Sequence, residues 1–160
     1  MIVVHNILPE YDKSSKILIL GSFPSVKSRE QEFFYGHAKN RFWKVVSAVF
    51  CDTEPVSIEE KKAFLHRHNI ALWDVIKSCE IVGSADSSIK SVLPNDLSVV
   101  LDNSAVSKIF INGKTAYKYF KKFSENSCKI QAICLPSTSP ANAGVSLNEL
   151  IKTWSIINQN

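Results

Sequence analysis

Two hydrophobic patterns alternate along this chain. Short, predominantly apolar runs occur at 17–20, 70–72, 109–111 and 130–135. Their length and continuity are typical of strands that are buried on both faces of a parallel sheet.

The segments between these runs have helical periodicity. Apolar residues recur at i, i+3, i+4, i+7 and i+8 from Phe42 to Phe50, which predicts a helix with one buried face. Further helices are predicted from Ser57 to about His68, after Gly113, and from Ser146 onward. Ser57 and Ser146 each precede a Glu by three residues, as in a capping box. Strands that alternate with helices predict an α/β fold, a three-layer α/β/α sandwich with a mainly parallel central sheet of about four strands. We expect residues 1–160 to form a single domain.

Such sheets bind ligands beyond the carboxyl ends of their strands. Three loops follow predicted strands there, at 21–25, 112–114 and 135–142. They are rich in small hydroxyl or amide residues, which suit contacts to phosphate oxygens. None contains a P-loop or a GxGxxG turn, so nucleotide binding of those kinds is not indicated.

The segment FFYGHAKNRFW, residues 33–43, has two interpretations. Phe34 or Tyr35 could offer a planar base a stacking surface, or these aromatic residues could simply pack the core. Asn40 precedes a predicted helix, so it could be an ordinary N-cap or belong to a site.

The charge of the chain is unevenly distributed. The net charge is +4, but residues 27–44 hold five basic and two acidic residues, and residues 108–129 hold six and one. Residues 52–102 hold five basic and nine acidic residues. One basic side would fit a polyanion, whereas scattered charge on solvated helices is the simpler explanation. The acidic middle segment contributes none of the loops identified above.

Several classes of protein are not indicated. No apolar run approaches the roughly 18 residues of a membrane span, and the N-terminus lacks a basic region like that of a signal peptide, so a cytoplasmic location is expected. The four cysteines form no CxxC motif, which gives metal or iron–sulfur ligation little support. We expect no cofactor, no metal and no membrane partner. Nothing in the sequence requires an oligomer, so a monomer is expected.

GSFPS at 21–25, FFYGHAKNRFW at 33–43, NGKTAY at 112–117 and LPSTSPAN at 135–142 resemble, in the same order, motifs of the uracil-DNA glycosylase superfamily. The second block is similar to the mismatch-specific uracil/thymine-DNA glycosylases. The first and last blocks are most similar to the hypoxanthine (deoxyinosine)-DNA glycosylase branch, as is ALWDVI at 71–76. The resemblance extends from about residue 4 to the C-terminus. It implies a partner, DNA that contains a damaged base.

The resemblance also implies where the chemistry lies. Most of the superfamily has a catalytic Asp or Asn at the position of Phe23, and the inosine-directed branch instead has its catalytic Asn at the position of Asn40. Asn40 would orient the attacking water through its amide oxygen, while backbone N–H groups near Ser22 and Phe23 would donate to the departing base. Tyr35 would stack on the flipped base, Phe23 would form another wall, and Asn112 would read the base or cap the following helix.

The last loop is implied to grip DNA. The hydroxyls of residues 137–139 would bind phosphates beside the lesion, and residues 140–142 would fill the gap left by the flipped nucleotide. The implied DNA-binding residues are Ser25, Lys27, Lys114, Ser137, Thr138, Ser139, Pro140, Ala141 and Asn142. Lys39 and Arg41 are additional phosphate candidates. For His37 a structural hydrogen bond is favoured over a role as general acid.

The function expected from the resemblance is a monofunctional DNA repair glycosylase that excises hypoxanthine, located at the nucleoid if the source is bacterial. Excision of uracil or another damaged base is the alternative within this class, since the pocket rather than the fold selects the base. A non-catalytic module that binds damaged DNA is the alternative from another class. An esterase that uses Ser22 or Ser25 is disfavoured, because the chain has no GxSxG motif.

Overall fold

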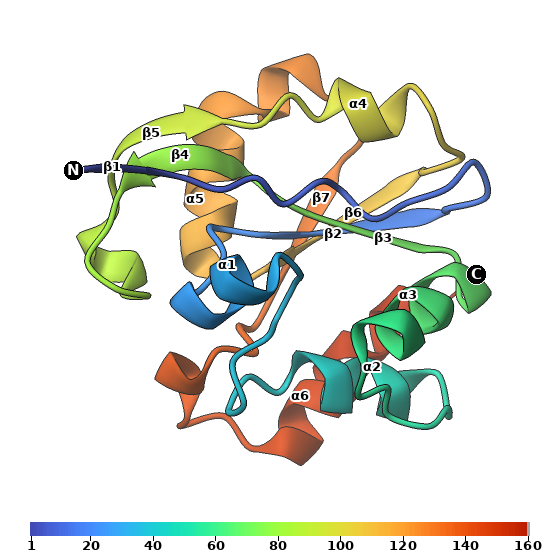
Figure 1. Cartoon of the computed structure of the whole chain (residues 1–160). Helices are drawn as coiled ribbons and strands as arrows, with labels where there is room; N and C mark the ends of the chain where they lie inside the picture. Colours follow the sequence, from blue (N-terminus) through green and yellow to red (C-terminus); the bar gives the residue numbers. More distant parts are fainter. Residues whose placement is uncertain (160) are drawn as a thin grey trace.

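The computed structural model describes residues 1–159 (Figure 1). The strands are β1 (Ile2–Val4), β2 (Ile17–Gly21), β3 (Ile70–Asp74), β4 (Ile76–Glu80), β5 (Lys90–Pro94), β6 (Lys108–Asn112) and β7 (Ala132–Leu135). The helices are α1 (Val26–Gln31), α2 (Phe42–Val49), α3 (Ile58–Arg67), α4 (Ser98–Leu101), α5 (Lys114–Phe123) and α6 (Leu147–Trp154). Short 3₁₀ turns include η1 (Asp86–Ser88) and η3 (Pro140–Asn142).

A four-stranded parallel sheet, in the order β3-β2-β6-β7, forms the centre of the molecule. Every residue of β2 and β3 is buried, as the continuous apolar runs predict. Gly21 is in register with Asp74, and Asn112 with Leu135, so the carboxyl ends of all four strands lie at one edge of the sheet. This edge is where the predicted loops emerge.

Helices cover both faces of this sheet. The chain moves in opposite directions from β2 to β3 and from β6 to β7, so right-handed crossovers place their helices on opposite faces. In Figure 1, α2, α3 and α6 lie on one side and α4 and α5 on the other. The predicted α/β architecture with a four-stranded parallel sheet is confirmed.

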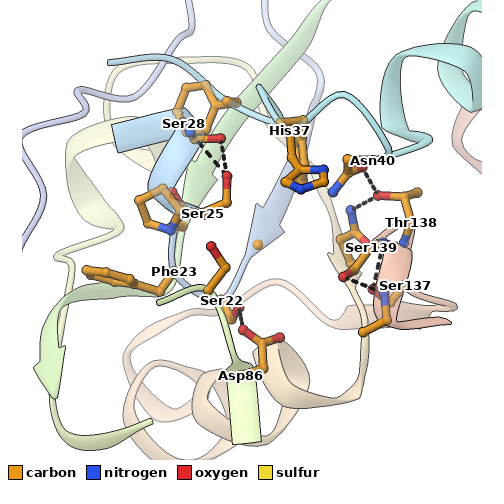
Figure 2. A pocket seen from close by; sticks show the side chains of 18 of the residues that line it. Ser22, Phe23, Ser25, Ser28, His37, Asn40, Asp86, Ser137, Thr138 and Ser139 are labelled. Atoms are coloured by element: carbon orange, nitrogen blue, oxygen red, sulfur yellow. Dashed lines mark hydrogen bonds between the residues drawn. The ribbon is translucent and has the colours of Figure 1, made fainter. Parts of the chain in front are cut away.

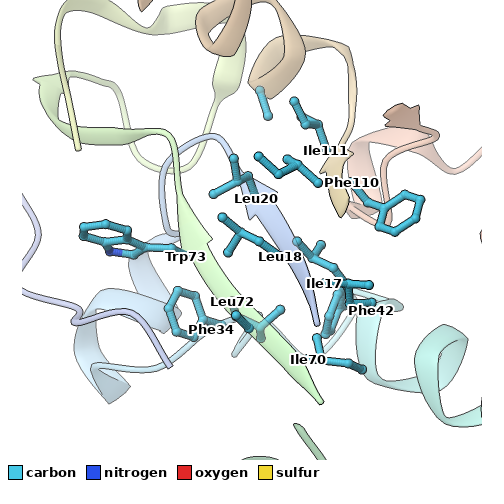
Figure 3. Close-up of a cluster of buried hydrophobic side chains, with 14 of the residues drawn as sticks. Ile17, Leu18, Leu20, Phe34, Phe42, Ile70, Leu72, Trp73, Phe110 and Ile111 are labelled. Carbon is cyan, nitrogen blue, oxygen red and sulfur yellow. The ribbon is translucent and has the colours of Figure 1, made fainter. Parts of the chain in front are cut away.

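The core lies between the sheet and the helices. Figure 3 shows Leu18 and Leu20 of β2 among side chains from β3, β6 and the segment before α2. Leu18, Leu20, Leu72 and Phe42 are all 0% exposed. Phe42, the first apolar residue of the predicted helical stripe, packs edge-on against Trp154 of α6.

A second, three-stranded antiparallel sheet, in the order β1-β4-β5, was not predicted. β1 is apolar but has only three residues, β4 has an exposed Lys77, and β5 is exposed along most of its length, so none of these strands resembles a buried central strand in sequence. β3 is also longer than predicted, ending at Asp74 instead of Leu72, and β7 begins at Ala132. Only Val75 separates β3 from β4, so the chain passes almost directly from one sheet into the other.

The helix starts agree in part with the sequence signals. Ser57 and Glu60 form the complete, reciprocal capping box at α3. At α6, Ser146 accepts from the Glu149 N–H, but its hydroxyl bonds the Glu149 carboxylate, so this box is incomplete. α2 has Arg41, not Asn40, in the N-cap position.

Candidate active site

A pocket with a cavity volume of about 270 Å³ opens at the carboxyl edge of the parallel sheet (Figure 2). Segments far apart in the sequence line it together: the loop after β2, the segment before α2, the end of β6 and the loop after β7. The pocket therefore joins the four motif blocks. Its lining includes these predicted site residues: Ser22, Phe23, Ser25, Tyr35, Asn40, Asn112, Ser137, Thr138, Ser139, Pro140 and Ala141.

The orientation of the Asn40 amide is fixed by its neighbours. Its Oδ1 accepts from the Phe42 backbone N–H at 3.0 Å and from the Thr138 hydroxyl at 2.8 Å. A backbone N–H can only donate, so the amide oxygen must face it and the amide cannot be flipped. Figure 2 shows the Asn40 nitrogen on the side away from Thr138. The oxygen, expected to hold water, is thus occupied by two donors, and the Nδ2 hydrogens are what Asn40 can offer to a substrate.

Thr138 was predicted to contact phosphate, and the structure corrects this prediction. The residue is 0% exposed, and its hydroxyl donates to Asn40 and accepts from Asn112 Nδ2 at 2.9 Å. The Thr138 N–H also donates to Asn112 Oδ1 at 3.0 Å. Thr138 is therefore an internal bridge. Asn112 is held at both ends of its amide. It does not cap α5, because the N-cap position is Gly113, which has no side chain to cap the helix.

The two aromatic candidates lie differently in the pocket. Tyr35 has a left-handed φ of 52°, and one face of its ring stacks on Phe42 with centroids 4.0 Å apart. Phe23 is only 7% exposed, and its ring packs against His5 and lies under the Arg29 guanidinium. Figure 2 shows this ring directed away from Asn40. Phe23 therefore belongs mainly to the core, which is a poor position for the predicted wall of a base pocket.

The serine hydroxyls at the pocket differ in whether their protons are available to a ligand. The Ser25 hydroxyl caps α1 and donates to Ser28 Oγ. Ser137 accepts from the Ser139 N–H, and Ser139 accepts from the Ala141 N–H. Because these two hydroxyls are used as acceptors, their protons are available to an anionic partner. The Ser22 hydroxyl donates to Asp86 at 3.1 Å.

The tip of the last loop is clamped by Arg41. Its guanidinium donates to the Val145 backbone oxygen at 2.6 Å and to the Asn142 backbone oxygen at 3.0 Å. The side-chain amide of Asn142 donates to the backbone carbonyl oxygen of Ser137, and Asn142 does not line the pocket. Arg41, expected to be a phosphate ligand, thus holds the loop in place instead.

The two lysines in the predicted DNA-binding set lie outside the pocket lining. Lys27 is exposed on α1, 4.0 Å from the Glu30 carboxylate, and Lys114 is exposed at the first position of α5. His37 does line the pocket, and its Nδ1 accepts from the Lys39 N–H. In the neutral ring this contact leaves the proton on Nε2, which makes His37 a donor.

Two acids that sequence reasoning missed, Asp74 and Asp86, also line the pocket. Asp74 is the last residue of β3, is 5% exposed, and has a pKa that burial, together with the Asp86 carboxylate, raises to about 7. Burial also raises the pKa of Asp86. The strand predicted over residues 70–72 extends to Asp74, which brings this side chain to the carboxyl edge of the sheet, where ligands bind.

Two further properties concern metals and membranes. Among residues 1–159, no group of three or more His, Cys, Asp or Glu side chains is arranged to hold a metal ion. None of the helices in this part of the chain is long and apolar enough to cross a membrane.

Comparison with known proteins identifies the family. The model of the uracil DNA glycosylase superfamily matches residues 8–157. A hypoxanthine DNA glycosylase of Methanosarcina barkeri is 33% identical over 69% of this chain and 72% of its own. Another, of Methanosarcina acetivorans, is 34% identical over 86% of this chain and 87% of its own.

A solved structure supports the same relationship. The NMR structure of a candidate uracil DNA glycosylase from Methanosarcina acetivorans superposes with a TM-score of 0.80 at 29% identity, covering 99% of this chain and 100% of that one. The family match over most of the sequence and the likeness of the fold agree, and the chain belongs to the uracil-DNA glycosylase superfamily.

Proposed function

We propose that this protein is a monofunctional DNA glycosylase that flips hypoxanthine out of DNA and hydrolyses its N-glycosidic bond. The observation that carries the proposal is the fixed amide of Asn40, whose Nδ2 is free at the pocket. The motif resemblance adds that Phe23 stands where most of the superfamily has a catalytic Asp or Asn. The curated relatives named above, both hypoxanthine DNA glycosylases, support this choice of base.

The reaction fits what the pocket offers. Flipping a base costs a few kcal/mol, less when the base is poorly paired. Breaking the bond develops positive charge on the sugar and negative charge on the base. Asn40 would hold the attacking water through an Nδ2 hydrogen, and the water needs little activation once the sugar carries positive charge. His37 Nε2–H would provide a second donor at the rim.

The loop after β7 would grip the DNA. The Ser137 and Ser139 hydroxyls have protons free for phosphate oxygens, and Arg41 holds the 140–142 tip in one conformation. A preorganised tip loses less entropy when it fills the gap left by the flipped nucleotide. Tyr35 would stack on the base, and Ser25, Lys27 and Lys114 would add contacts to the flanking backbone. The proposal includes action as a monomer on cytoplasmic DNA.

The direct test is a set of duplex oligonucleotides that contain deoxyinosine, deoxyuridine or only normal bases. Each is incubated with the pure protein and then treated with alkali, which cleaves the strand at abasic sites. The proposal expects cleavage at deoxyinosine under single-turnover conditions, and none at normal bases. Strand cleavage before alkali would contradict the monofunctional assignment.

The alternatives give different results in the same assay. Faster release of uracil than of hypoxanthine would move the substrate to the uracil-directed class. Selective binding of the damaged duplexes without any release of base would identify a non-catalytic damage-binding module. Cys51, the exposed cysteine, lies outside the pocket lining, so labelling it with a fluorophore provides a binding readout that leaves the site intact.

A further inference from the structure

The carboxyl group of Asp74 is the least explained polar group in the pocket. Asp74 is 5% exposed, and its Oδ2 is buried with no hydrogen-bond partner among residues 1–159. Burying a carboxyl group without a partner is strongly unfavourable when it is charged. A group kept in this state at the wall of a reaction pocket is a candidate for function.

The surrounding backbone makes room for this carboxyl group. Gly21 lies opposite Asp74 in the β2–β3 pairing. A Cβ at position 21 would lie 2.7 Å from Asp74 Oδ1 and 3.2 Å from the Tyr35 hydroxyl. Glycine therefore allows a carboxyl group and a phenol to approach the end of β2. The Tyr35 hydroxyl is likewise buried without a partner among the described residues.

The charges around Asp74 favour its neutral form. Asp86 faces it from η1 with a second carboxylate, and Tyr35 faces it from the loop before α2 with a neutral phenol, whose pKa burial raises. His37 stands at the same pocket, and the lining within residues 1–159 includes no Lys or Arg. Burial and Asp86 raise the pKa of Asp74 to about 7. A substantial part of the enzyme thus carries a neutral carboxylic acid there at neutral pH.

We propose that Asp74, as a neutral carboxylic acid, contacts the flipped purine and donates its proton to a ring nitrogen of the base as the glycosidic bond breaks. This inference rests on the proposed function. The C1′–N9 electron pair goes to the base, the Asp74 proton neutralises the resulting charge, and the water oxygen forms the new bond to C1′. The proton that the water loses passes to solvent, and solvent reprotonates the Asp74 carboxylate.

A proton donor at this position favours release of a purine over release of uracil. Hypoxanthine has ring nitrogens, N3 and N7, whose lone pairs are outside the glycosidic bond and can take a proton. Uracil has no such basic ring nitrogen, so a proton donor at this position would assist release of a purine much more than release of uracil. A well-placed general acid typically contributes 10²–10⁴-fold to a rate.

The test compares Asp74→Asn and Asp74→Ala with the unchanged protein on a deoxyinosine duplex, from pH 5.5 to 9, under single-turnover conditions. Asp102→Asn is the matched control, because Asp102 is exposed and outside the pocket lining. The unchanged protein and the control should lose rate above about pH 7, approaching tenfold per pH unit. Both Asp74 variants should be about 10²-fold slower or more at pH 6, and nearly flat across this range.

The outcomes separate this inference from the proposed function. An unchanged protein that releases no hypoxanthine at any pH refutes the proposed function. If the unchanged protein is active and the Asp74→Asn variant keeps its rate and its pH profile, Asp74 is not the proton donor, but the proposed function stands. If thermal melting shows that both variants are unfolded, the pH dependence of the rate of the unchanged protein tests the inference. A rate that does not fall above pH 7 excludes a neutral Asp74 as the proton donor. Affinity for a duplex with an abasic analogue should stay within about threefold in the variants, since the acid acts on the base.

Discussion

Asn40 presents a donor to the pocket because its oxygen is occupied by the Phe42 N–H and the Thr138 hydroxyl. An Asp at this position would keep both of those contacts, since a carboxylate is a good acceptor, but would lack the Nδ2 hydrogens. The pair Asn40→Asp and Asn40→Ala therefore separates the donor from the structural role.

We expect Asn40→Asp to lose at least about 10²-fold in single-turnover excision of hypoxanthine while melting within about 2 °C of the unchanged protein. Asn40→Ala should lose as much activity and also about 0.5–2 kcal/mol of stability, because the Phe42 N–H loses its acceptor. Thermal melting and alkaline cleavage measure the two effects. An Asn40→Asp variant that retains the rate would show that an acceptor at this position supports catalysis.

Asp74 should also make the stability of the fold depend on pH. Its pKa is 3.8 in the unfolded reference and about 7 in the folded protein, so between these values the folded state binds more protons. Stability from this group is therefore lost as pH rises from about 4 to 7 and is constant above.

Asp74→Asn removes this titration. We expect it to be more stable than the unchanged protein by about 1 kcal/mol or more at pH 8, which is roughly 2–4 °C in melting temperature, and to lose this advantage toward pH 4. Taking the difference between the two proteins cancels the other groups that titrate in this range. A difference that stays constant with pH would mean that Asp74 is charged in the folded protein throughout.

The pocket exists because the parallel strands end at a common edge of the sheet. The continuous apolar runs of β2 and β6 made these strands, and the loops after them, predictable. The antiparallel sheet was not predictable in this way, because β4 and β5 are partly exposed and β1 has only three residues, which pair with β4 far along the chain.

The same contrast applies to the site. Asn40 and the loop after β7 could be named as candidates from motifs and strand ends. The contacts that the individual side chains make there could not be predicted. Thr138 and Arg41 both carry groups suited to phosphate, and their tertiary contacts use those groups inside the protein. The partners of a hydroxyl or guanidinium are set by residues about 100 positions away, which no local pattern records.

β2 and β3 approach each other closely at their carboxyl ends, where Gly21 faces Asp74. Gly21→Ala places a methyl group 2.7 Å from Asp74 Oδ1, so the carboxyl group or the strand must shift. We expect a loss of about 1–3 kcal/mol in the free energy of unfolding, together with a clear loss of excision. Gly144→Ala is the control, because a Cβ there meets nothing within 4 Å. Equal stability and activity in the two variants would show that the end of β2 has room for a side chain.

For the molecule as a whole, the net charge of +4 combines regions of opposite sign. The acidic middle segment contains none of the loops identified from the sequence, yet it supplies Asp74 and Asp86 to the pocket. Within residues 1–159, no Lys or Arg of the flanking segments belongs to the pocket lining, so these residues can face the DNA backbone instead. Acids inside and lysines outside would let one site contact both a base and phosphates.

This distribution predicts that affinity for DNA falls steeply with salt. Each phosphate neutralised contributes about −0.9 to the slope of log K against log salt, so two contacts give a loss of about tenfold between 50 and 200 mM.

Two lysine variants test this prediction. Lys114→Gln should make the slope shallower by about 0.9, the contribution of one phosphate contact. Lys13→Gln should leave the slope unchanged, because Lys13 is exposed just before β2, at the edge of the sheet opposite the pocket. Fluorescence anisotropy with a deoxyinosine duplex and the inactive Asn40→Ala protein measures the slope. A salt response that is flat, or equal in the two lysine variants, would mean that Lys114 is an ordinary solvated charge.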